Sequence, residues 1–348
     1  MKHITLLVVG AVALNACALI DEDMGDCNAP FSVEYELQLV TNLTTELQTQ
    51  LSLSTGISVS SALKTKLQSV FTDHAHDVDL SFYDVSGDSL RLYHVPDIID
   101  DSQNTYTLRI PVRKYMHLAV ANVMDNQVVH LRDSMICHKS SFHQVVQDTI
   151  GCHKTGLFSA RQPMDVQAGV DQQFDVHLYM ANCATSIIMD TVGSGIRDAR
   201  VFLSGFATDF DIADSTYRFE YTPIIRPEKV EVPDEAGAPI CYASVNFPSR
   251  DIPNTKVVIE GDEPFASDVA GQALWQIRVY CTLDDGSTTE TILGMLKPLR
   301  PGQFKLVRVS VKGDGSAIPV TPSGDEDPTV AVGITLDWHS GLVIDVPL

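Results

Sequence analysis

The stretch that decides the fold is residues 31–39, which read FSVEYELQL. Apolar side chains alternate with polar ones there, so Val33, Tyr35 and Leu37 share one face and Glu34 and its polar neighbours share the other. A period of two residues is typical of a half-buried β-strand. The stretch therefore predicts a strand with one face against a core and the other against water.

The same alternation returns several times along the chain. Residues 78–85 and 90–95 are two further strand-like runs, and the Ser-Gly-Asp-Ser turn between them predicts a hairpin. Many short strands separated by Gly, Pro and Asp turns predict an all-β protein made of antiparallel β-sandwiches. The remaining alternating stretches run from Tyr106 to Val112, from Phe174 to Met180, from Trp275 to Cys281 and from Val330 to Trp338.

One region has helical spacing instead. Leu43, Leu47 and Leu51 recur every four residues, and a second apolar set follows Gly56 at positions 63, 67, 70 and 71. Apolar stripes with this period predict one or two short surface helices. We expect these helices to lie against the first sheet.

The length of 348 residues suggests two domains. Glycine and proline cluster from Gly151 to Gly169, and a new alternating strand begins at Phe174. We therefore predict an N-terminal sandwich over residues 31–168 and a C-terminal sandwich over residues 169–348.

Charge limits the classes of partner. The chain has 24 Lys and Arg against 45 Asp and Glu, a formal net charge of −21. Nucleic acids bind to basic surfaces, so we expect no nucleic-acid partner. The only long apolar run is at the N-terminus, and no interior run is long enough for a transmembrane helix.

The N-terminus has the pattern of a bacterial lipoprotein signal peptide. Lys2 precedes an apolar run over residues 4–14, and the run ends in Leu-Asn-Ala-Cys at Cys17. We predict a signal peptide over residues 1–16 and acylation of Cys17, which would anchor the chain in a membrane. The alternative is an ordinary secretory signal. Residues 17–30 contain four acidic residues and are expected to form a lipidated acidic tether.

Six cysteines remain once Cys17 is assigned to the lipid. In an exported protein an even number permits disulfides, and six allow fifteen full pairings. Cys137 and Cys152 lie nearest to each other and flank a polar segment. We predict a disulfide between them. With His138, His143 and His153 the two cysteines supply zinc-ligand types as the alternative, but the spacing matches no zinc finger.

The best metal-like cluster is His74 and His76, with Asp73, Asp77 and Asp79 beside them. Two histidines at alternate positions of a strand share a face, and carboxylates could complete a site. A polar loop entering a strand explains the cluster more simply, so we predict no metal site. No nucleophile elbow, phosphate loop, dinucleotide fingerprint or metalloprotease helix occurs. We therefore expect no enzyme activity and no cofactor.

Several segments, taken in order, resemble a known family. Cys17 and Cys27 flank the acidic stretch, and three runs then follow: VDLSFYD at 78–84, YMHLAVA at 115–121 and FDVHL at 174–178. Together they resemble the FimB-like fimbrial anchor and minor-subunit lipoproteins of Bacteroidales. The acidic stretch is similar to the export signal of surface lipoproteins in the same group.

The resemblance implies two tandem transthyretin-like β-sandwiches, a lipid anchor in the outer membrane and exposure at the cell surface. It also implies assembly with fimbrial pilin subunits by β-strand complementation. Residues 122–126 lack the aromatic-Gly pair of the family, and the insertion over residues 41–71 is long. Base anchor and accessory subunit therefore both stay open. The apolar tail over residues 342–348 is either a donor strand or the last edge strand of its own domain.

The competing interpretation is a carbohydrate-binding surface lipoprotein of a glycan-uptake system. Such proteins bind sugars on exposed aromatic side chains. Two tryptophans and an aromatic content of 7% offer few candidates, which favours the fimbrial interpretation.

Overall fold

The computed structural model describes residues 31–40, 50–51, 56–71, 77–85, 89–98, 105–124, 126–191, 193, 195–233, 237–251, 273–320 and 330–335. Strands dominate these residues, beside the helix α3 (Ile57–Val70) and the short 3₁₀ helix η1 (Cys137–Lys139). The prediction of an all-β protein with a short helix is confirmed. In this part of the chain no helix is both long and apolar enough to cross a membrane.

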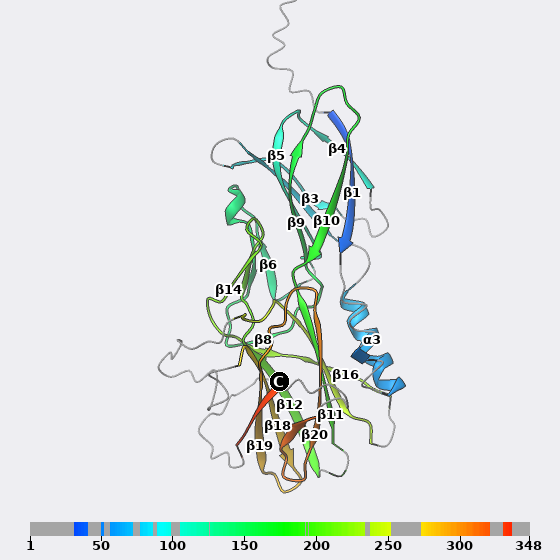
Figure 1. Ribbon diagram of the computed structural model, residues 1–348, viewed down its shortest axis with the longest axis vertical. Helices are drawn as coiled ribbons and strands as arrows, with labels where there is room; N and C mark the ends of the chain where they lie inside the picture. The colour runs from blue at the N-terminus through cyan, green and yellow to red at the C-terminus, as the bar shows by residue number, and fades with distance from the viewer. Residues whose placement is uncertain are drawn as a thin grey trace, which may run out of the picture.

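One seven-stranded sheet forms the N-terminal half, in the order β3-β2-β5-β9-β10-β1-β4. The predicted hairpin of β2 and β3 is present. Figure 1 shows these strands in the upper part of the molecule. Their bounds are β1 (Phe31–Val40), β2 (Val78–Asp84), β3 (Arg91–Ile98), β4 (Thr105–Ile110), β5 (Lys114–Ala121), β9 (Phe158–Asp165) and β10 (Gln173–Met180).

This sheet folds back on itself to make the first sandwich. β9 and β10 pair only at Ser159–Tyr179 and Phe158–Met180, after which they diverge. The layer β4-β1-β10 thereby packs over the layer β3-β2-β5-β9. A contact across the core shows the closure, because Tyr35 of β1 donates a hydrogen bond to Nε2 of His117 on β5, three strands away.

His117 is fully buried in this core. Its Nδ1 donates to the carbonyl of Ser81 at 3.0 Å, and its ring stacks on Phe82 with centroids 4.3 Å apart. Burial lowers the pKa of His117 to about 4, since the charged form would lose its hydration. The imidazole is therefore neutral near pH 7 and serves as a hydrogen-bonding core residue.

Strand pairing departs from the sequence-based division in one respect. The strand at Phe174, expected to open the second sandwich, is β10, and it pairs with β1 in the first. The β1–β10 pair is also parallel, so the sheet is mixed rather than wholly antiparallel. Alternation identifies a strand and its faces but not its neighbour. We therefore propose a junction at Ala181–Asn182, between β10 and β11, in place of 168/169.

Two sheets form the second sandwich, in the lower part of Figure 1. Trp275, Ile277 and Leu203 lie in the core between them. The first sheet has the order β16-β17-β11-β20-β21 and the second β22-β19-β18-β12-β15-β8. Their bounds are β8 (Thr149–Gly151), β11 (Cys183–Asp190), β12 (Ile196–Ser204), β15 (Ile224–Arg226), β16 (Glu228–Val230), β17 (Ile240–Asn246), β18 (Trp275–Leu283), β19 (Thr288–Met295), β20 (Phe304–Val311), β21 (Ala317–Pro319) and β22 (Val330–Thr335).

A small sheet, in the order β14-β13-β7-β6, links the two sandwiches. It consists of β6 (Val129–Arg132), β7 (Ser141–Gln144), β13 (Asp209–Asp211) and β14 (Thr216–Arg218). Phe142 and Phe210 stack on its inner face, in one core cluster with Leu118 and Val120 of β5. Because β13 and β14 follow β12 in sequence, this sheet ties the second sandwich to the outer face of the first.

Helix α3 does not lie where we expected. Its apolar stripe of Leu63, Leu67 and Val70 is buried as predicted, but the helix contacts β16 and β17 of the second sandwich. Lys66 forms an ion pair with Glu228 of β16 at the same place. The apolar spacing predicted the helix, whereas its partner depends on where the chain returns after β1. Figure 1 shows α3 running alongside the lower domain.

A buried polar network holds the junction between the sandwiches. Nε2 of His153 donates to Oε1 of Gln144 at 3.1 Å, and its Nδ1 accepts from Nδ2 of Asn182 at 2.7 Å. The Asn182 carbonyl accepts the N–H of Gly302 at 2.7 Å. Burial lowers the pKa of His153 to about 3, so this histidine is also neutral at pH 7.

The predicted disulfide is absent from the structure. Cys137 and Cys152 are both free, buried thiols. Cys137 belongs to the cluster around the small sheet and Cys152 to the core of the second sandwich. Proximity in sequence failed as a guide because β7 and β8, which lie between the two cysteines, enter different sheets.

Candidate functional site

An open slot lies between β9 and β10, where the two strands diverge. Below the slot the strands are bonded, since the N–H of Ala181 donates to the carbonyl of Leu157 at 2.8 Å and Tyr179 pairs with Ser159. At the far end the side chain of Gln172 bridges the strands. Its Nε2 donates to the carbonyl of Asp165 at 2.9 Å, and its Oε1 accepts the N–H of Gln167 at 2.7 Å.

Backbone groups line the slot on both sides. In a ladder, the N–H and C=O of alternate residues point to opposite edges of a strand. The backbone N–H and C=O of Ser159 point toward β10, so those of Arg161 point into the slot. The backbone groups of Gln162 point toward β5. On β10 the N–H and C=O of Asp175 and His177 face the slot by the same alternation. No strand pairing between β9 and β10 continues there among the described residues.

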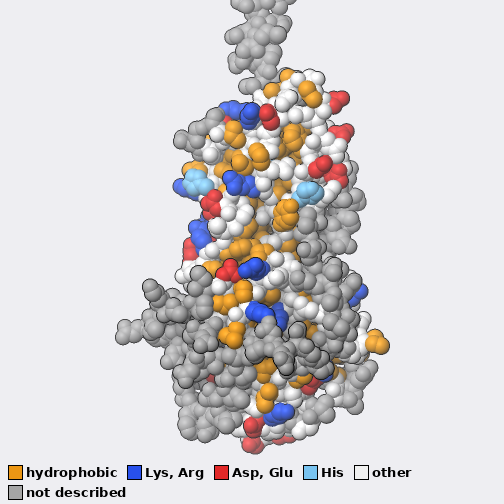
Figure 2. Space-filling view, viewed as in Figure 1, with side chains coloured by type: hydrophobic (Ala, Val, Ile, Leu, Met, Phe, Trp, Pro, Cys, Tyr) orange, Lys and Arg blue, Asp and Glu red, His pale blue; other side chains and the backbone are white. Residues whose placement is uncertain are grey.

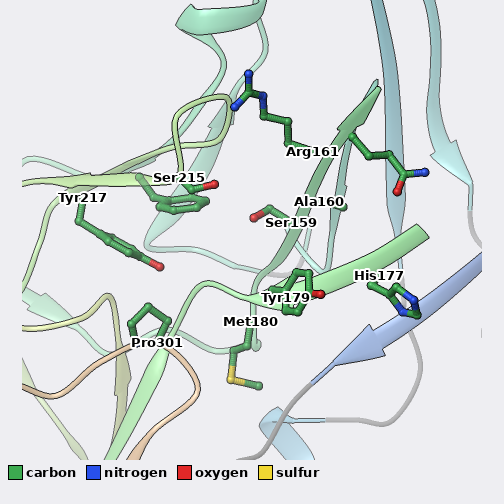
Figure 3. A pocket seen from close by; sticks show the side chains of 11 residues that line it. Ser159, Ala160, Arg161, His177, Tyr179, Met180, Ser215, Tyr217 and Pro301 are labelled. Atoms are coloured by element: carbon green, nitrogen blue, oxygen red, sulfur yellow. The ribbon is translucent and has the colours of Figure 1, made fainter. Parts of the chain in front are cut away.

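The side chains at the slot form a cavity of about 570 Å³. Figure 3 shows Arg161 on β9 and His177 on β10. Tyr179 lies between these two residues on one side and Tyr217 on the other. Tyr179 is 60% exposed, which is high for a large aromatic residue on a strand. Tyr217 is held in place, because its hydroxyl donates to the carbonyl of Ala181 at 2.9 Å. The slot thus combines an apolar floor with polar walls.

Pro163 belongs to the same edge of β9. By the alternation its nitrogen faces the slot, where a proline costs no ladder hydrogen bond to β5. A proline in a strand is typical of an edge, so it is the one sequence signal that could have marked β9 as an open strand.

Charge around the slot is mixed, since exposed Asp175 lies two residues from His177 on β10. Arg161 and His177 lie on its rim in a protein with a net charge of −21. Figure 2 shows hydrophobic, cationic and acidic side chains interspersed on the upper half of the molecule. An extended peptide with apolar and polar side chains matches such a surface.

The arrangement can accept a β-strand. Free N–H and C=O groups on two facing edges supply main-chain hydrogen bonds, and alternate side-chain positions supply register. An exposed edge normally attracts another strand unless it is covered or blocked. A strand inserted between β9 and β10 would form backbone hydrogen bonds with both edges at once, which is β-augmentation.

The predicted site residues lie elsewhere. Cys17, His74 and His76 are outside the described residues, as is the tail over residues 342–348. Asp77 accepts the backbone N–H groups of Val123 and Met124, and Asp79 accepts from His94 at 2.7 Å. Both carboxylates thus have partners other than a metal. Within the described residues, no group of three or more His, Cys, Asp and Glu side chains could hold a metal ion.

Comparison with known proteins gives likeness in fold only. No family model matches the sequence, and no curated protein matches it. A candidate adhesin from Bacteroides ovatus is similar with a TM-score of 0.50 and 9% identity, over 84% of this chain and 94% of that one. This likeness shows a shared fold.

Two further solved structures are similar with lower TM-scores. A candidate polysaccharide-binding protein from Bacteroides thetaiotaomicron has a TM-score of 0.49 and 9% identity, over 84% of this chain and 99% of that one. The fimbrial anchor protein Mfa2 from Porphyromonas gingivalis has a TM-score of 0.44 and 10% identity, over 88% of this chain and 97% of that one. The solved structures similar to this chain thus include a candidate adhesin, a candidate polysaccharide-binding protein and a fimbrial anchor protein.

Proposed function

We propose that this chain is a subunit of a surface fimbrium and binds a pilin subunit by accepting a strand between β9 and β10. The observation that carries the proposal is the slot, whose two edges keep unpaired backbone groups over Arg161, Asp175 and His177. A strand inserted there would be antiparallel to one edge and parallel to the other, since β9 and β10 are antiparallel. It would continue the first sheet across its open side.

The rest of the proposal concerns place. The signal-peptide pattern before Cys17 supports a lipid anchor in the outer membrane, and the acidic tether supports exposure at the cell surface. β1, the first described strand, begins near the upper end of the molecule in Figure 1. A role in adhesion without catalysis fits the fold shared with a candidate adhesin, although a fold alone assigns no function.

The test is recovery of partners from sheared outer membranes, followed by mass spectrometry of what stays bound. Arg161→Pro with His177→Pro removes two N–H groups that face the slot and leaves the bonds to β5 and β1 intact. Arg161→Ala with His177→Ala is the matched control, because it removes both side chains but keeps both backbone donors. We expect an SDS-resistant pilin complex with the parent chain and with the double alanine variant, and none with the double proline variant.

Equal recovery of pilin by the double proline variant would contradict strand binding at this slot. Recovery of a porin-like transporter without pilin would contradict the fimbrial role itself.

The second candidate function is carbohydrate binding, and the exposed ring of Tyr179 beside Arg161 and Gln162 favours it. Aromatic faces with adjacent planar polar groups are a common way to hold a sugar. Reproducible hits on a glycan array that Tyr179→Ala abolishes would support this alternative, whereas the strand proposal predicts no hits.

A further inference from the structure

Two histidines lie opposite each other on neighbouring strands of the small sheet. His130 of β6 pairs directly with His143 of β7, and His143 pairs on its other side with Asp209 of β13. Residues that pair directly in an antiparallel sheet point to the same face. The neighbouring Phe142 and Phe210 point into the core, so the two histidines and Asp209 point away from it.

Hydrogen-bonding parity fixes the spacing of these pairs. The N–H of Val145 donates to the carbonyl of Val128, so the pair two residues on, His130 and His143, is a hydrogen-bonded one. The Cβ atoms of such pairs lie about 5.5 Å apart. The bond from Gln144 N–H to the carbonyl of Thr208 makes the His143–Asp209 pair the closer, non-bonded kind.

Asp209 orients the imidazole of His143. Its carboxylate is fully buried, and Oδ1 accepts from Nδ1 of His143 at 2.5 Å. Oδ2 accepts from the hydroxyl of Thr208 at 3.0 Å. With Nδ1 engaged as the donor, the lone pair of a neutral His143 ring is on Nε2. The His143 side chain is 24% exposed and His130 is exposed, so solvent reaches the pair.

We propose that His130 and His143 bind a divalent transition-metal ion, with Asp209 as the carboxylate that orients the second ligand. A metal-bound histidine commonly donates its other ring N–H to a carboxylate, which fixes its tautomer and raises its basicity. Two imidazoles about 5.5 Å apart at Cβ can converge on one ion at metal–nitrogen distances of about 2.0–2.1 Å. Water completes such a site, which suits an exposed surface and moderate affinity.

Two arginines share the exposed face of this sheet with the histidines, and Arg132 is two residues from His130 along β6. Arg218 of β14 is the next residue in the same row, but it lies beyond Asp209. It is therefore two strand spacings from His143, about 10 Å, whereas the buried carboxylate lies between them. Bound metal would join β6 to β7 in the sheet that links the two sandwiches.

The test is isothermal titration calorimetry of the full chain with Cu²⁺, Ni²⁺ or Zn²⁺, each added alone. His74 and His76, which could bind metal elsewhere, are replaced by alanine in every variant. We expect one equivalent of metal, with Cu²⁺ bound more tightly than Ni²⁺. His130→Ala should abolish this binding, and Asp209→Asn should weaken it roughly 10–100-fold. His138→Ala removes an exposed histidine without a cross-strand partner and should change nothing.

A second measurement keeps the test sound if Asp209→Asn folds poorly. The electron paramagnetic resonance spectrum of bound Cu²⁺ should report two nitrogen ligands, and metal should raise the unfolding temperature of the parent chain but not of His130→Ala. Because His130 is exposed, its replacement leaves the fold intact. Unchanged affinity in His130→Ala, or no binding by the parent chain, would overturn the proposal.

Discussion

Acid should destabilise this protein well above the range in which its carboxylates titrate, because two buried histidines must gain a proton. His117 lies in the first core and His153 at the junction, and burial lowers the pKa of His117 to about 4 and that of His153 to about 3. The ordinary value, which applies in the unfolded chain, is 6.5. As pH falls below 6.5 the unfolded chain therefore binds protons before the folded chain does.

The sign and size of the effect follow from linkage. The contribution to stability is complete above pH 6.5 and is lost as pH falls through the window down to the folded pKa. Each histidine loses up to about 1.4 kcal/mol per pH unit there, or about 2.5 kcal/mol by pH 4.5. Together the two lose roughly 5 kcal/mol, which is comparable to the whole stability of many domains.

The assay is urea denaturation at pH 7, 6, 5 and 4.5, followed by circular dichroism. His153→Gln costs stability at pH 7 because its bonds to Gln144 and Asn182 are lost. It should nevertheless flatten the fall of the unfolding free energy between pH 6 and 5 by about 1 kcal/mol per unit. His138→Gln, at an exposed histidine, should keep the parent slope. Equal slopes in the parent chain, His117→Gln and His153→Gln would refute the reasoning.

Three further predictions concern packing and thiols. Gly205→Ala should lower the unfolding free energy by about 2 kcal/mol or more in thermal denaturation, since φ is +94° and a Cβ would lie 2.7 Å from Cα of Trp275; an unchanged melting temperature would contradict the packing there. Tyr242→Phe should cost about 1–3 kcal/mol in the same assay, because the hydroxyl donates to the buried carbonyl of Ala199 at 2.6 Å, and a neutral result would mean that water replaces it. The five buried thiols should resist a disulfide-exchange reagent in the native chain and react with it in urea without a reductant. A disulfide between Cys137 and Cys152 would instead lower the mass of the chain by two hydrogens. The five are Cys137, Cys152, Cys183, Cys241 and Cys281.

Local patterns in the sequence predicted the elements of the fold. Alternation over residues 31–39 and 174–180 identified β1 and β10, and the apolar stripe at Leu63 and Leu67 identified α3. These signals work because each depends on which face of one element is buried. These patterns carry no information on which strand lies beside which. They therefore could not predict the parallel β1–β10 pair or the contact of α3 with β16 and β17.

The candidate site could not be predicted from the sequence. The slot exists because the pairing of β9 with β10 ends at Ser159 and Tyr179, after which the two strands belong to different layers of the folded sheet. That divergence is a long-range property, and only Pro163 hints at it in the sequence. The cross-strand histidine pair likewise depends on register between β6 and β7, which brings together His130 and His143, thirteen residues apart.

The central claim is that β9 and β10 present unpaired edges that a partner strand fills, and site-resolved amide hydrogen exchange tests it most directly. In the free chain, the N–H groups of Arg161 and His177 should exchange much faster than those of Gln162, bonded to β5, and Val176, bonded to β1. In the pilin-bound chain all four should be protected. Equal protection of Arg161 and Gln162 in the free chain would contradict the account, because the slot would then already be closed.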